Sequence, residues 1–224
     1  MDTEIINSYC NVCLGDRTHR ILHQDKNRWE QDIGASFSIE GCDTYYLCKC
    51  CGCGHIHLRN DSWFSEDTDD DGAPTVRTSY FPPQTFRREP FWLLTLRHDD
   101  PEPLRAVSEL LLEVYKALRT DSPRLAAMGI RALTEHVMID KVGDNGTFKE
   151  NLQKFLDQGF ISSVQKRYLE SVIELGHATM HRSHCPKKED IVTTLDIIES
   201  VLETIYVTSK KLADIEQRIP KRKK

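Results

Sequence analysis

The stretch that decides the fold is CKCCGCG at residues 48–54, in which four cysteines fall within six positions. It contains two overlapping Cys-x-x-Cys pairs, Cys48 with Cys51 and Cys50 with Cys53, and a glycine follows the second cysteine of each pair. A tight turn of this kind points two thiolates toward one place, so either pair supplies half of a tetrahedral metal site.

The other half of such a site stands upstream in CNVC at residues 10–13, and about 36 residues separate it from Cys50. Two Cys-x-x-Cys turns bring four thiolates together around zinc, and this spacer is long enough for a small three-stranded sheet. The metal adds folding free energy to a module of about 60 residues, whose own core is small. We therefore predict a zinc ribbon over residues 1–60 with structural Zn²⁺ bound by Cys10, Cys13, Cys50 and Cys53.

The choice between the two downstream pairs depends on where the preceding strand ends. If residues 45–49 form a strand, Cys50 and Cys53 lie on the turn after it, and Cys48 is packed inside the sheet. Cys48 and Cys51 remain the alternate ligands. Either set closes the coordination sphere with four thiolates, which leaves no open position for catalysis at the metal.

Composition places the chain among proteins of one large or two small domains. Seven of the eight cysteines lie in the first 53 of 224 residues, and the sequence shows neither a secretory signal nor an apolar run of about 18 residues. We therefore expect a cytoplasmic protein with no membrane contact, in which clustered cysteines bind metal. The net charge of −5 argues against an extended basic surface for duplex DNA, although a local basic groove is compatible with that total.

The chain after residue 60 changes character twice. Six acidic residues lie within residues 61–72, and six prolines lie among aromatic residues within 73–103, so residues 61–101 are predicted to form an acidic loop followed by an extended connector. Apolar residues then recur at three-and-four spacing across residues 102–210, and the last segment, 211–224, is a basic tail. The expected helices cover residues 104–118, 122–143, 147–159, 162–182 and 189–206. The predicted fold class is α+β, a small β module followed by a mainly α five-helix bundle.

Five segments of the helical part form a distinctive set: SPRLAAMGIRALTEHV at 122–137, GDNGT at 143–147, LDQGFIS at 156–162, LGHATMH at 175–181 and LDIIESVLETIYV at 195–207. In these segments the helical part resembles the DUF4145 domain, a bacterial helical domain grouped with the HEPN superfamily. The CCGCG segment at residues 50–54 and the proline-rich connector also resemble the region often fused in front of it.

This resemblance implies a HEPN-like bundle that forms homodimers and, in catalytic relatives, cleaves RNA without a metal by using an arginine and a histidine. By position, His181 matches the histidine, and Arg131 with Glu135 matches a polar pair on the second helix. The arginine expected one to two turns before the histidine is missing, since residues 168–176 (YLESVIELG) contain no basic residue. Arg182 or Arg131 would have to replace it.

The same stretch has a second interpretation as a metal site. His177 and His181 are four positions apart on one helical face, with His184 and Cys185 just beyond, a spacing that suits a transition metal. The alternative is a set of partly exposed histidines near the end of a helix.

The leading functional hypothesis is a bacterial protein that binds nucleic acid or a protein partner, with catalysis reduced or absent. The resemblance implies work in stress response or phage defence. The expected partners are a second copy in a homodimer, RNA or DNA, and a protein docked on the zinc ribbon. The alternatives are a metal-independent endoribonuclease that uses His181 and a homodimeric assembly module without nucleic-acid contact.

Overall fold

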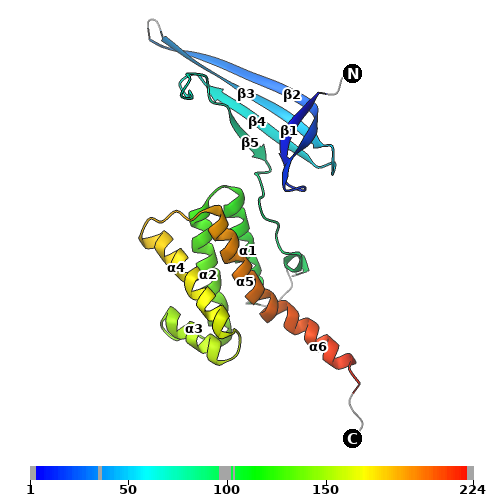
Figure 1. Ribbon diagram of the computed structural model, residues 1–224, viewed down its shortest axis with the longest axis vertical. Coiled ribbons are helices and arrows are strands. Elements are labelled where there is room, and N and C mark those ends of the chain that lie inside the picture. The colour runs from blue at the N-terminus through cyan, green and yellow to red at the C-terminus, as the bar shows by residue number, and fades with distance from the viewer. Residues whose placement is uncertain (1–3, 35–36, 96–101, 103, 221–224) are drawn as a thin grey trace. The chain divides into compact units, whose positions relative to one another are not determined.

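The computed structural model describes residues 4–34, 37–95, 102 and 104–220, and the chain divides into two compact units, Met1–Arg87 and Arg88–Lys224 (Figure 1). The first unit is an antiparallel sheet and the second is a group of helices, so the α+β prediction is confirmed. Among the described residues, no helix combines the length and apolar character that crossing a bilayer requires.

The sheet is a five-stranded meander in which each strand is antiparallel to the one before it. Its strands β2 and β3 form one long hairpin that dominates the unit (Figure 1). The strands are β1 (Ile5–Cys10), β2 (Gly15–Gly34), β3 (Phe37–Cys50), β4 (Ile56–Phe64) and β5 (Arg77–Phe81).

One face of this sheet is buried, and its side chains are mostly small or polar. Because side chains alternate along a strand, every second position of β3 points to this face. His19 stands opposite Cys50, and His57 stands opposite Cys48, so both histidines extend the same buried face. A face with so few large apolar side chains gains little from hydrophobic burial, which favours additional stabilisation by a metal. The buried positions of β3 on this face are Cys42, Thr44, Cys48 and Cys50.

The sheet extends further along the chain than the sequence predicts. Its end was expected at residue 60, with a loop and connector over 61–101, but β4 continues to Phe64 and β5 adds an edge strand. The acidic stretch between them turns tightly, because Asp69 Oδ1 accepts the N–H groups of two residues in the same turn. Across the strand pair, the Thr78 hydroxyl donates to Asp61 Oδ1 at 2.7 Å. The unit ends at Arg87.

The helical unit contains the five predicted helices, after a short 3₁₀ turn at Phe91–Thr95. Residues Glu203–Thr208 form a π-helical turn that carries α5 directly into a further helix, α6 (Ser209–Arg218). Most of the segment expected as a basic tail is therefore helical, and its final residues, 221–224, lie outside the described part. The five helices are α1 (Leu104–Arg119), α2 (Pro123–Val142), α3 (Phe148–Asp157), α4 (Ser163–His181) and α5 (Lys188–Leu202).

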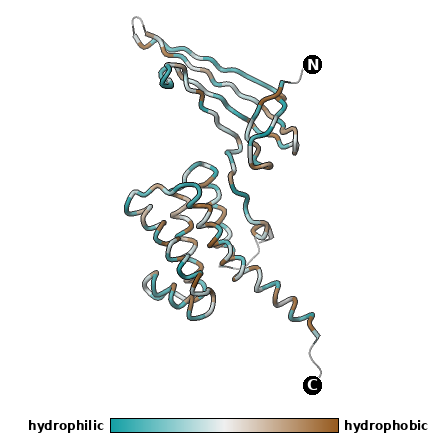
Figure 2. Tube along the Cα trace, viewed as in Figure 1, coloured by the Kyte–Doolittle hydropathy of each residue, from teal (hydrophilic) through white to brown (hydrophobic). Residues whose placement is uncertain are grey.

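Apolar stripes hold these helices together, and Figure 2 shows the apolar positions recurring along α1, α2, α4 and α5. Polar side chains start the helices, since Thr147 accepts the N–H of Glu150 and Ser162 forms a reciprocal capping box with Gln165. The fully buried side chains at the centre include Leu111, Tyr115, Ile130, Leu133, Leu169, Leu195, Ile198 and Leu202.

Helices α2 and α4 approach each other closely at Gly176. A Cβ at this position would lie 2.6 Å from Cβ of Arg131 and 3.2 Å from the carbonyl oxygen of Ala127. No side chain larger than hydrogen fits there without moving one helix, so this glycine sets the spacing of the pair.

Candidate metal centre

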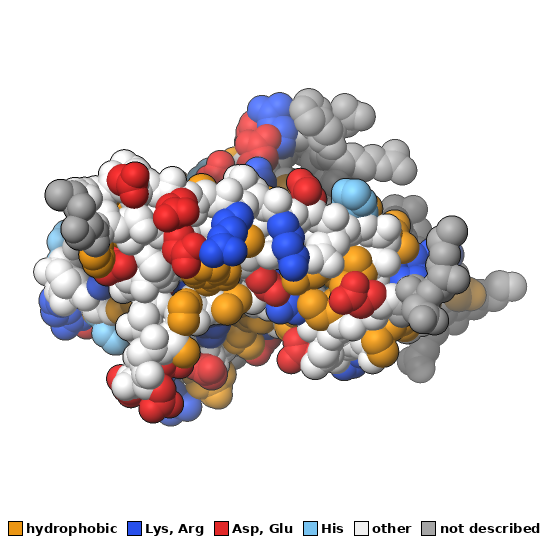
Figure 3. All heavy atoms as spheres, turned by 90° about the horizontal axis from the view of Figure 1, so that it is seen from above, with side chains coloured by type: hydrophobic (Ala, Val, Ile, Leu, Met, Phe, Trp, Pro, Cys, Tyr) orange, Lys and Arg blue, Asp and Glu red, His pale blue; other side chains and the backbone are white. Residues whose placement is uncertain are grey.

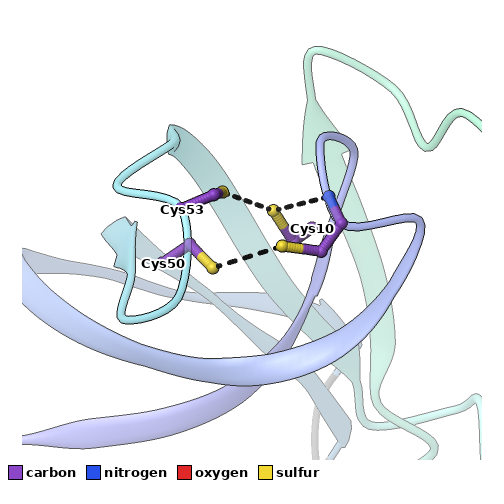
Figure 4. A group of neighbouring side chains, drawn as sticks. Cys10, Cys50 and Cys53 are labelled. Atoms are coloured by element: carbon purple, nitrogen blue, oxygen red, sulfur yellow. Dashed lines mark hydrogen bonds between the residues drawn. The ribbon is translucent and has the colours of Figure 1, made fainter.

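Two turns of the sheet unit bring four cysteines to one point. Cys10 ends β1, Cys50 ends β3, and each is followed three residues later by a second cysteine in the turn. The thiols from the two turns point toward one another (Figure 4). The sulfur atoms of Cys10, Cys13, Cys50 and Cys53 all lie within 4.8 Å of one another.

The spacing of the sulfurs suits a tetrahedral metal. The Cys10 and Cys53 sulfurs are 3.5 Å apart, and those of Cys13 and Cys50 are 4.0 Å apart. A tetrahedron with Zn–S bonds of about 2.3 Å has sulfur–sulfur edges of about 3.8 Å. All four cysteines are free thiols, so the cluster can bind a cation.

Backbone hydrogen bonds hold the second turn in place. The Gly54 N–H donates to the Cys50 carbonyl at 3.0 Å, and the Cys50 N–H donates to the His55 carbonyl at 2.8 Å. The Cys51 N–H reaches Thr18 on β2 at 3.0 Å, which fastens this turn to the strand that follows the first turn. In the first turn, the Cys13 N–H donates to the Cys10 sulfur at 3.5 Å.

Other backbone N–H groups of the second turn make one thiol acidic. Burial raises the pKa of Cys50, but the N–H groups of Cys53 and Gly52 lie against its sulfur, and the net result is a pKa of about 7. The neighbouring Cys53 sulfur, together with burial, raises the pKa of Cys13 to about 12, and burial raises that of Cys10. Four thiols this close resist joint ionisation, and a divalent cation would remove that resistance.

The alternate ligand pair is not part of the cluster. Cys48 is fully buried on β3, where desolvation raises the pKa of its thiol, and Cys51 is exposed in the turn. The strand phase explains the difference, because β3 runs to Cys50 and leaves that residue and Cys53 on the turn side. Cys48 instead lies opposite Ile21 and His57 within the sheet.

Two buried histidines lie near the cluster: His57, whose alternation with Ile56 and Leu58 predicts a strand residue, and His19, which no motif of the sequence marks. His19 and His57 lie edge to face with ring centroids 4.8 Å apart. The Nε2 atom of His57 is 3.1 Å from the Ser8 hydroxyl, and His19 Nδ1 donates to the Arg17 carbonyl at 2.8 Å. Burial, with the nearby His19 imidazole adding to it, lowers the pKa of His57 to about 4, so its ring is neutral at pH 7.

The predicted catalytic residues of the helical unit lie on α2 and at the end of α4, where these two helices pack together, and Arg131 Nη1 lies 3.4 Å from the sulfur of Met180, the residue before His181. His181 is exposed, with its ring centroid 4.6 Å from that of His177. Arg182 forms an ion pair with Glu174, and the Arg131 guanidinium carbon lies 5.6 Å from the centre of the Phe148 ring. Within the described part of the chain, no hydrogen bond or ion pair joins His181 to either arginine or to Glu135, which is half-buried on α2.

Comparison with known protein families gives a match within the helical unit. Residues 112–219 match the family model of DUF4145. That family is described as a domain of unknown function. The match supports the DUF4145 resemblance for this part of the chain. No curated protein matches the chain, and no solved structure matches it.

Within the DUF4145 match, the surface is hollowed along the last turns of α4. The hollow measures about 500 Å³ and includes Arg182 but neither His177 nor His181. His184 and Cys185 follow the helix and are exposed, and among the described residues the group gathered closely enough for a metal is the four-cysteine cluster. The residues that line the hollow are Ser171, Glu174, Leu175, Ala178, Arg182 and His184.

Proposed function

We propose that the protein is a zinc-stabilised, protein-binding module of the bacterial cytoplasm. Its sheet unit acts as a zinc-ribbon-like platform, and its DUF4145 helices have the HEPN architecture with catalysis reduced or absent. The observation that carries the proposal is the convergence of the Cys10, Cys13, Cys50 and Cys53 sulfurs within 4.8 Å. Four thiolates close the coordination sphere, so zinc there would hold the fold in shape and leave recognition to the protein surface.

The charge of the sheet unit favours a protein partner over nucleic acid. Residues 1–87 carry 14 acidic and 8 basic side chains. Phosphate backbones bind mainly to clustered Lys and Arg, and a net acidic unit repels them. The face drawn in Figure 3 mixes acidic, basic and hydrophobic side chains and shows no basic stripe.

The contacts of two arginines in the helical unit support the proposal that catalysis is reduced or absent. RNA cleavage of the type implied by the resemblance needs a cation beside the histidine to stabilise the developing charge on phosphorus. Arg182 is paired with Glu174, and the Arg131 side chain contacts Phe148 and donates to the Met180 sulfur at 3.4 Å. Both candidate cations are thus engaged by other groups.

The proposal is tested by site-specific photo-crosslinking in cells, with the crosslinker at exposed Leu47 of the sheet unit. We expect a discrete protein adduct for the full-length chain, loss of that adduct in the zinc-ligand variant Cys50→Ser, and retention in Cys51→Ser. A mobility-shift titration with single-stranded RNA and duplex DNA at low salt is run beside it. A salt-sensitive shift without a protein adduct would replace the proposal with nucleic-acid binding.

A second candidate, an endoribonuclease, is favoured by the exposed His177–His181 pair. The test incubates the zinc-loaded chain with tRNA and total RNA beside His181→Ala. Equal background from both chains is the expected result. Cleavage by the wild-type chain that the variant lacks would establish this second function instead.

A further inference from the structure

Strand β2 has a long edge that no described strand covers. β1 pairs with β2 only from Gly15 to Arg20, whereas β3 follows the opposite edge of β2 as far as Gly34. In the described part of the sheet, residues 22–34 of β2 therefore have one neighbour only. An open edge of this length offers a row of backbone donors and acceptors to another strand.

Hydrogen bonds elsewhere in the sheet show which residues of β2 direct their backbone N–H and C=O groups to that edge. Glu40 of β3 stands opposite Glu30, but its backbone is bonded on the other side: its carbonyl accepts the Ser65 N–H at 2.9 Å, and its N–H donates to Ser65 Oγ at 3.2 Å. The N–H and C=O of Glu30 must therefore point away from β3. Backbone direction alternates along a strand, so Lys26, Arg28 and Asp32 share this orientation.

Four residues direct their backbone groups to the open edge, and in chain order they carry two positive and then two negative charges: Lys26, Arg28, Glu30 and Asp32. Arg28 is bonded to Glu40 at 2.6 Å, with 68% of its side chain exposed. Lys26, Glu30 and Asp32 make no ion pair with any described residue. Glu30 also faces the like charge of Glu40, an arrangement that an additional cation would relieve.

We propose that the β2 edge of a second copy of this chain pairs with this edge, antiparallel and about a two-fold axis at Trp29. In that register Arg28 stands opposite the partner's Glu30, and Lys26 stands opposite the partner's Asp32. The hydrogen-bonding positions allow shifts only in steps of two residues. A step in one direction sets Arg28 against the partner's Arg28, and a step in the other sets Glu30 against the partner's Glu30, so the charges select one register.

Trp29 lies at the proposed two-fold axis, and its side chain turns inward over β3 toward β4. It stacks on Phe64 with ring centroids 5.9 Å apart, and 38% of its surface is exposed. Gly41 makes room for it, since a Cβ on that glycine would lie 2.6 Å from the indole ring. The indole is thus held over β3, away from the open edge, so it leaves the backbone of β2 accessible to the partner strand at the two-fold axis.

The order of the charges separates this edge from one that only resists aggregation. Protective edges use charges that repel any incoming strand. The order Lys26, Arg28, Glu30, Asp32 is self-complementary when the strand is turned end to end, which is the symmetry that a two-fold dimer imposes. The pairing uses the sheet unit alone and does not depend on the protein partner proposed above.

The test is a charge-swap experiment on the full-length, zinc-loaded chain, with mass measured by sedimentation equilibrium. Glu30→Arg sets Arg28 against the partner's new arginine, and Arg28→Glu sets two glutamates against each other. We expect each variant to raise the dissociation constant of the dimer by roughly tenfold or more, because two attractive cross-strand pairs become repulsive. An equimolar mixture of the two variants restores both pairs and should recover the dimer.

Arg77→Glu is the matched control, because Arg77 is an exposed arginine on the opposite edge strand with its own ion pair, to Asp67. It should leave the dimer unchanged. Circular dichroism verifies that each variant folds, and Glu30→Arg is the gentlest of them, since it places a cation opposite Glu40. A monomeric wild-type chain, unchanged mass in either swap variant, or failure of the mixture to recover the dimer would overturn the proposal.

Discussion

The sulfur atoms of Cys10 and Cys53 lie 3.5 Å apart although 43 positions separate the two residues in the chain. Each of the two residues lies in a local turn built around a Cys-x-x-Cys pair. The strands between the two turns account for the long separation in the chain. The stability of the sheet unit should therefore rise when a metal ion binds the four thiols.

The first prediction concerns metal content. The purified chain should carry about one zinc ion, and Cys50→Ser should lose it because three thiolates bind zinc far more weakly than four. Elemental analysis measures the ratio, and circular dichroism should show loss of the strand signal with the helical signal retained. Cys51→Ser, an exposed neighbour in the same turn, is the control and should keep its zinc. Full zinc content in Cys50→Ser would contradict the assigned ligand set.

The second prediction concerns the loss of stability at acidic pH. His57 has a pKa of about 4 in the folded chain, below the usual value of 6.5, so the unfolded chain binds this proton first as the pH falls. The free energy of unfolding should be at its full value above pH 6.5 and should decline between pH 6.5 and 4, by roughly 1–3 kcal/mol for this group.

Urea unfolding of the zinc-loaded chain at several pH values measures that decline. His57→Gln should show a shallower dependence over the same window, while loss of thiolate ligands in acid affects both chains equally. Identical slopes for the two chains would show that His57 does not titrate differently on folding.

The third prediction concerns the contact between α2 and α4. Gly176→Ala places a methyl group 2.6 Å from Cβ of Arg131 and 2.9 Å from its Cδ. Cβ is fixed to the helix, so the helices must separate, and we expect a net loss of roughly 1–3 kcal/mol despite the better helix propensity of alanine. Thermal unfolding measures the loss. Ser171→Ala, an exposed change on the same helix, should be near neutral, and equal melting temperatures for both variants would contradict the close approach.

The fourth prediction concerns a buried hydrogen bond between α1 and α5. The Tyr115 hydroxyl donates to Glu199 Oε1 at 2.6 Å, and both side chains are buried. Tyr115→Phe should cost roughly 1–3 kcal/mol because the carboxylate loses a buried donor. A double-mutant cycle with Glu199→Gln measures the coupling. Tyr168→Phe, at an exposed tyrosine on α4, should change stability little, and a coupling near zero would rule out the bond as a stabilising contact.

Much of this architecture follows from local chemistry that the sequence displays. The Cys-x-x-Cys spacing determines which thiols share a turn, and the three-and-four spacing of apolar residues determines the five helices. Thr147 and Ser162 mark helix starts because their hydroxyls accept backbone N–H groups within one turn. Each of these features depends on residues only a few positions apart.

Other features are decided only by the tertiary structure, because they depend on contacts between residues far apart in the chain. The phase of β3 excludes Cys48 from the cluster, and the pairing of β4 with β5 turns an expected loop into sheet. The open edge at Glu30 likewise follows from the order of the strands in the sheet. Strand pairing and side-chain contacts form between distant segments, so a local pattern of residues does not specify them.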